Sequence, residues 1–113
     1  MATVQVGGQQ LPGTFTNHFL AHLQVAAAAR FAAGKGFFLT TTQSDGNGER
    51  TVSHWLHPGL PVSFGFDIAD GDGGRLSPVA VDTAEVDELT AAMDTPYGVR
   101  GSDGVWWPFA EHL

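Results

Sequence analysis

The chain has 113 residues, of which 42% are hydrophobic, so it is long enough for one domain with its own core. Its formal charge of −7 disfavours direct binding to a nucleic-acid backbone, which needs many Lys and Arg side chains. The absence of Cys excludes disulfides, thiolate nucleophiles and zinc ligated by Cys. No segment has the pattern of a secretory signal or a membrane span, so we expect a cytoplasmic protein that does not act on membranes.

The first expected elements are two antiparallel strands, at residues 3–6 and 9–15. Gly7 and Gly8 separate them, and a Gly pair permits the positive φ angles of a tight hairpin turn. Pro12 restricts the second strand to an edge or a bulge, because proline cannot donate a hydrogen bond to a neighbouring strand.

A long Ala-rich helix is expected from Thr16 to Lys35, because Ala is the strongest helix former. Thr16 or Asn17 can cap its start, and Gly34 supplies the left-handed residue that ends many helices. At helical spacing, one face is apolar and should pack on the core; it carries Phe19, Leu20, Leu23, Ala26, Ala27 and Phe31, with Arg30 intruding near its end.

The opposite face of this helix has almost no charge. It carries Ala21, Val25, Ala28, Ala29 and Ala32, with two histidines beside them. A helix that is apolar all round is usually buried on both sides. Two interpretations remain open: an Ala-rich face in contact with solvent, or a contact surface for a partner subunit or a second layer.

The middle of the chain predicts a hairpin and a further strand. Residues 36–43 and 50–58 are strand-like and flank the turn sequence SDGNGE at 44–49. Residues 62–68 alternate between apolar and polar, which predicts that Val62, Phe64, Phe66 and Ile68 face the core.

A second helix is expected at residues 83–94, with short strands at 76–81 and 97–100 beside it. Asp82 and Glu85 have the spacing of a capping box, and Pro96 ends the helix. The order β-β-α-β-β-β-α-β predicts one α+β domain over residues 1–100: an antiparallel sheet of about five strands with two helices on one face. Residues 101–113 are expected to form an aromatic, acidic tail.

The histidines are weak candidates for a metal site. His18 and His22 are four residues apart on the first helix, and His54 or His57 could add a third ligand. The Glu of the H-E-x-x-H motif is missing, because Phe19 follows His18. We therefore expect these histidines to be surface or hydrogen-bonded core residues, with no bound metal or other cofactor.

The aromatic residues near the C-terminus are the other unusual feature. Two interpretations are possible for Trp106, Trp107 and Phe109: they fold back on the domain, or they contact a partner. We favour folding back.

Three stretches of the sequence resemble a family of small uncharacterised actinobacterial proteins that often carry the label "ATP-dependent DNA ligase". They are LAHLQV at 20–25, GFFL at 36–39 and WLHPGLPVSFGF at 55–66, and the likeness extends over residues 15–101. The label implies a Lys nucleophile in a K-x-D-G motif. The only Lys, Lys35, is followed by Gly36, Phe37 and Phe38, so the resemblance implies no ligase activity here.

The leading prediction is a non-catalytic protein–protein interaction module that forms homo-oligomers. Its expected contacts are the uncharged helix face and the aromatic residues near the C-terminus. The alternatives are a small metal-dependent enzyme that uses the histidines, or an acidic accessory protein or mimic that acts on nucleic-acid-handling machinery.

Overall fold

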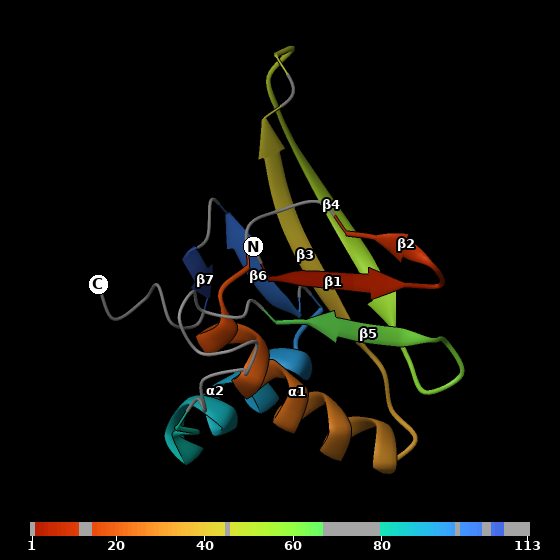
Figure 1. The fold of residues 1–113 in the computed structure, drawn as a ribbon, viewed down its shortest axis with the longest axis vertical. Coiled ribbons are helices and arrows are strands. Elements are labelled where there is room, and N and C mark those ends of the chain that lie inside the picture. Colours follow the sequence, from red (N-terminus) through yellow and green to blue (C-terminus); the bar gives the residue numbers. More distant parts are fainter. Residues whose placement is uncertain are drawn as a thin grey trace, which may run out of the picture.

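The protein has an α+β fold in which two helices lie on one side of two small sheets (Figure 1). The computed structural model describes residues 2–11, 15–44, 46–66, 80–96, 98–102 and 105–107. In chain order the elements are β1 (Thr3–Val6), β2 (Gln9–Gln10), α1 (Asn17–Ala32), β3 (Phe37–Ser44), β4 (Glu49–Leu56), β5 (Val62–Gly65), α2 (Thr83–Met93), β6 (Val99–Ser102) and β7 (Val105–Trp107).

The strands do not form the single antiparallel sheet expected from the sequence. One sheet has the order β2-β1-β5 and the other has the order β4-β3-β6-β7, in which β6 runs parallel to β3. The parallel pairing brings the backbone at Gly98, which has φ +66°, close to the backbone of Phe38 in β3. A Cβ atom there would lie 1.9 Å from the carbonyl oxygen of Phe38. Gly is therefore required where the chain enters β6.

Both expected hairpins form, but β2 covers only Gln9–Gln10 of the strand expected at residues 9–15. Gly7 and Gly8 have φ angles of 60° and 83°, as a type I′ turn between β1 and β2 requires. Strands β3 and β4 pair continuously from Phe37↔Leu56 to Ser44↔Glu49, and this hairpin extends well beyond the rest of the fold (Figure 1). Strand β5 is shorter than expected, and Ile68 lies outside the described residues.

Helix α1 begins as expected but ends earlier, at Ala32. The hydroxyl of Thr16 accepts a hydrogen bond from the backbone N–H of Phe19, and Gly34 adopts φ 76° just beyond the helix. Arg30, expected near the end of the core face, is only 14% exposed. Its guanidinium donates to the carbonyl oxygens of Gly36 and Met93 and pairs with the carboxylate of Asp94.

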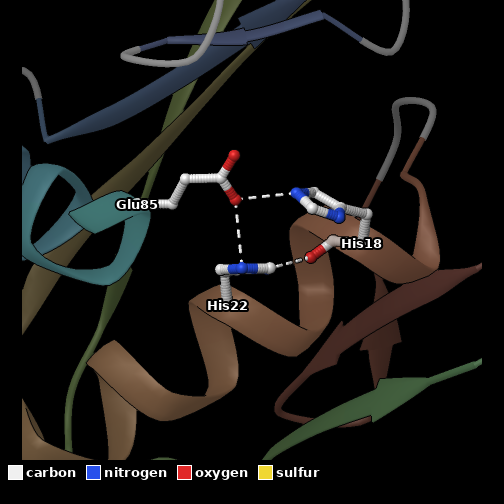
Figure 2. Close-up of side chains that lie close together, drawn as sticks. All are labelled: His18, His22 and Glu85. Carbon is white, nitrogen blue, oxygen red and sulfur yellow. Dashed lines mark hydrogen bonds and ion pairs between the residues drawn. The ribbon is translucent and has the colours of Figure 1, made fainter. Parts of the chain in front are cut away.

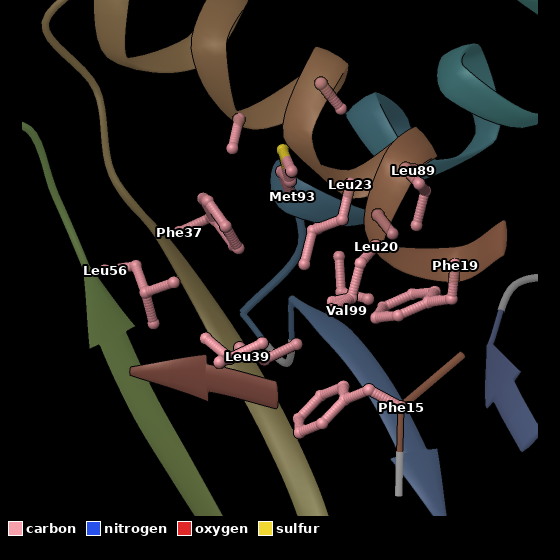
Figure 3. Close-up of a cluster of buried hydrophobic side chains, with 14 of the residues drawn as sticks. Phe15, Phe19, Leu20, Leu23, Phe37, Leu39, Leu56, Leu89, Met93 and Val99 are labelled. Atoms are coloured by element: carbon pink, nitrogen blue, oxygen red, sulfur yellow. The ribbon is translucent and has the colours of Figure 1, made fainter. Parts of the chain in front are cut away.

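The core lies between the helices and the strands, as Figure 3 shows. Its fully buried large side chains come from both helices and both sheets: Val4, Phe19, Leu20, Leu23, Phe37, Leu39, Leu56, Leu89 and Val99. The expected core face of α1 is confirmed apart from Phe31, which is half-buried. Phe64 and Phe66 are also half-buried and pack against the edge of the core.

Candidate functional site

His18 and His22 meet Glu85 where the first turn of α2 crosses the start of α1 (Figure 2). The Oε2 atom of Glu85 lies 2.7 Å from Nε2 of His18 and 3.0 Å from Nε2 of His22. The spacing of four residues places both histidines on one side of the helix, and their ring centroids are 4.3 Å apart. We call these three residues the His–Glu cluster.

Burial differs sharply within the cluster. The side chain of His22 is 0% exposed, whereas those of Glu85 and His18 are 31% and 54% exposed. The cluster therefore has one fixed member inside the protein and one member that reaches solvent.

Both ring nitrogens of His22 have partners. Nδ1 lies 2.7 Å from the carbonyl oxygen of His18, which can only accept, so Nδ1 carries a proton. Nε2 accepts a hydrogen bond from the backbone N–H of Asp82, 2.9 Å away. His22 is thus held as the neutral Nδ1–H tautomer, with its Nε2 lone pair directed at the start of α2.

Sequence reasoning did not find Glu85 as a partner of the histidines. It assigned Glu85 to a capping box, in which its carboxylate would accept from the backbone N–H of Asp82. The Asp82 carboxylate does cap α2, accepting from the N–H of Ala84 at 2.9 Å, but His22 takes the Asp82 N–H. The carboxylate of Glu85 faces the histidines instead. The Asp-x-x-Glu spacing located this residue in the first turn but carried no signal for contact with α1.

The strand histidines do not join the cluster. Among the described residues, the only group of three potential ligands is His18, His22 and Glu85. His54 shares a face of the sheet with buried Leu39, and its Nε2 atom has no hydrogen-bond partner within the described part of the chain. Burial lowers the pKa of His54 from 6.5. The Nδ1 atom of His57 accepts from the backbone N–H of Gly59 at 3.2 Å.

The uncharged face of α1 remains largely exposed. Val25 is 45% exposed, Ala28, Ala29 and Ala32 are exposed, and Ala21 is half-buried. Helix α2 packs beside this face and covers His22, but it leaves the Val25 side chain uncovered. The described part of the chain therefore supplies no second layer over these residues.

A shallow apolar groove borders this face, between α1 and β5, which lie side by side in Figure 1. It has a volume of about 290 Å³ and is lined by Gln24, Ala28, Phe31, Val62, Phe64 and Phe66. The sequence predicted Phe31, Phe64 and Phe66 as core residues. All three rings are half-buried, and all three line this groove.

The expected C-terminal tail contributes backbone to a sheet. Residues 105–107, which include Trp106 and Trp107, form β7 and pair with β6. Phe109 lies outside the described residues. Neither helix of the described chain is long and apolar enough to cross a bilayer.

The fold and these features define a small α+β domain with an interhelical His–Glu cluster and an uncharged helix face. Residues 1–103 match the model of a protein family described as a domain of unknown function, DUF7882. The chain belongs to this family. No curated protein matches the chain, and no solved structure matches it either.

Proposed function

We propose that this protein is a non-catalytic interaction module that self-associates through one side of α1. The observation that carries the proposal is the apolar groove between α1 and β5, together with the exposed apolar face beside it. A contiguous apolar surface of this kind is a common property of protein–protein interfaces.

The side chains suit close contact between two helices. Ala28, Ala29 and Ala32 are small, so a second backbone can approach closely, and Val25 provides a larger apolar contact among them. The half-buried rings of Phe64 and Phe66 would lose their remaining contact with water when the groove is covered. Burial of apolar area contributes about 25 cal/mol per Å², and this supplies the driving force.

A second copy of the chain is the proposed occupant. In a twofold dimer the same patch of each subunit forms both halves of the interface, so an uncharged patch meets an uncharged patch. This pairing brings no like charges into direct contact, although each chain has a formal charge of −7.

The test is the solution mass of the wild type and of Val25→Glu, measured by sedimentation equilibrium over a range of concentrations. A Glu at this position would be desolvated in the dimer without a partner, at a cost of several kcal/mol. We expect a wild-type dimer and a folded Val25→Glu monomer. Gln9→Glu, on exposed β2, adds the same charge away from α1 and should leave the dimer intact. A wild type that is monomeric throughout would overturn the proposal.

The alternative of a small metal-dependent enzyme draws on the His–Glu cluster. The groove between α1 and β5 includes none of the three cluster residues, so the cluster is not part of that surface. The alternative of an acidic accessory protein rests on charge alone. The interaction module therefore has the stronger support.

A further inference from the structure

We propose that His18, His22 and Glu85 bind one divalent transition-metal ion, with zinc the best match, at the junction of α1 and α2. This site is separate from the self-association surface and does not depend on it. The proposal rests on the ligand types, on their convergence and on the way His22 is held (Figure 2).

Three potential ligand atoms converge at the cluster. The two Nε2 atoms and Oε2 of Glu85 all lie within 4.8 Å of one another. Zinc–ligand bonds of about 2.0–2.1 Å in a tetrahedron place ligand atoms about 3.3 Å apart. The two contacts to Glu85, 2.7 and 3.0 Å, need to lengthen by about 0.3–0.6 Å, and the two Nε2 atoms, which lie within 4.8 Å of each other, need to settle at a similar separation. The exposed His18 and the partly exposed Glu85 have room to make this adjustment.

The orientation of His22 matches that of a metal ligand. A metal-bound His usually donates its other ring N–H to a carbonyl or carboxylate, which fixes the tautomer and the ring direction. Here Nδ1–H donates to the carbonyl oxygen of His18 and leaves the lone pair on Nε2. The most buried ligand is thus already in the tautomer that coordinates a metal.

The charge distribution also favours a cation. Nε2 of His22, which accepts the Asp82 N–H, also lies 3.0 Å from the Oε2 atom of Glu85. A divalent ion between these two atoms would contact both and would pair with the Glu85 carboxylate. It must compete with the Asp82 N–H for the same lone pair, which makes the site weaker than one in which Nε2 has no other partner.

The donor set indicates the class of metal. Two imidazoles and one carboxylate suit zinc and its neighbours in the first transition row better than magnesium or calcium, which prefer oxygen ligands. Three protein ligands leave a fourth tetrahedral position, which a water molecule can fill.

Isothermal titration of the chelator-treated 113-residue chain with ZnCl2 tests the site, and MgCl2 serves as the comparison ion. We expect one zinc per chain and no magnesium binding at the same concentrations. At a hundredfold excess of zinc over its dissociation constant, the melting temperature should rise by about 10 °C.

Variants of the two more exposed ligands test zinc binding without disrupting the fold. His18→Ala and Glu85→Gln should each weaken zinc binding at least tenfold while the protein remains folded by circular dichroism. His57→Ala removes a histidine outside the cluster and should retain wild-type affinity. A stoichiometry well below one, or equal affinity in His18→Ala, Glu85→Gln and the wild type, would show that the cluster is only an interhelical ion pair.

Discussion

His22 accepts a hydrogen bond from the backbone N–H of Asp82, so a buried side chain of α1 satisfies a free donor at the start of α2. The two residues are 60 positions apart in the sequence. The bond orients the first turn of α2 against α1 and places Glu85 next to the histidines. This one hydrogen bond therefore contributes both to the packing of the two helices and to the geometry of the His–Glu cluster.

Replacement of His22 should destabilise the protein whether or not a metal is present. His22→Ala leaves a cavity at a fully buried position, removes the acceptor of the Asp82 N–H and removes one donor to the His18 carbonyl. We expect a loss of about 3 kcal/mol in the free energy of unfolding. Urea denaturation in the presence of a chelator measures it. His18→Ala is the matched control and should cost less than about 1 kcal/mol, because that side chain is 54% exposed. Equal losses in the two variants would contradict a special role for His22.

Arg30 should stabilise the fold through the geometry of its guanidinium as well as through its charge. It is 14% exposed and donates to the carbonyl oxygens of Gly36 and Met93, at 2.9 and 3.1 Å, near the ends of both helices. Arg30→Met should cost about 2–3 kcal/mol, because these bonds are lost and the two carbonyls lose a donor. Arg30→Lys should recover only part of the loss, since one ammonium cannot reproduce the fork of donors. Chemical denaturation of both variants checks this, and full recovery by Lys would show that charge alone matters.

Acidification should destabilise the protein through His54. Burial holds the pKa of His54 below 6.5 in the folded state, so the unfolded chain binds a proton there first as the pH falls. The contribution of His54 is constant above pH 6.5 and is lost as the pH falls from 6.5 toward the folded pKa. Asp94, whose pKa is lowered by its hydrogen bond and charge interaction with Arg30, acts in a separate window below 3.8.

The variant His54→Leu isolates this effect. Unfolding free energies of the wild type and the variant should run parallel above pH 6.5, and the wild type should then lose stability more steeply between pH 6.5 and 5. Curves that stay parallel throughout this range would mean that His54 has the same pKa in the folded and unfolded states.

Local features of the fold were predictable because their causes lie within a few residues. The Gly7-Gly8 turn, the Thr16 cap and the hairpin around residues 44–49 each depend on side chains or φ preferences at the feature itself. The Asp82 cap of α2 was also predicted correctly, since its carboxylate accepts from the N–H of Ala84.

Features that join distant segments were not predictable from such patterns. Alternation in residues 62–66 indicated which side of β5 is apolar, but it did not indicate that β5 pairs with β1 in a separate sheet. The site shows the same limit. The spacing of His18 and His22 predicted a pair on one side of a helix, whereas their partner Glu85 comes from an element 67 residues beyond His18. The strand histidines, chosen for residue type alone, lie elsewhere.

The parallel pairing of β3 with β6 has a consequence for synthesis of the protein. Leu39 pairs with Val99, and the side chain of Val99 is fully buried in the core. Both hairpins and α1 precede this residue and can form from nearby contacts, but the core cannot close around them until β6 has left the ribosome. Contacts between distant segments also form slowly. The nascent chain therefore exposes Leu39 and its neighbours while the 60 residues from Leu39 to Val99 are made, and this period is when aggregation or chaperone binding would compete with folding.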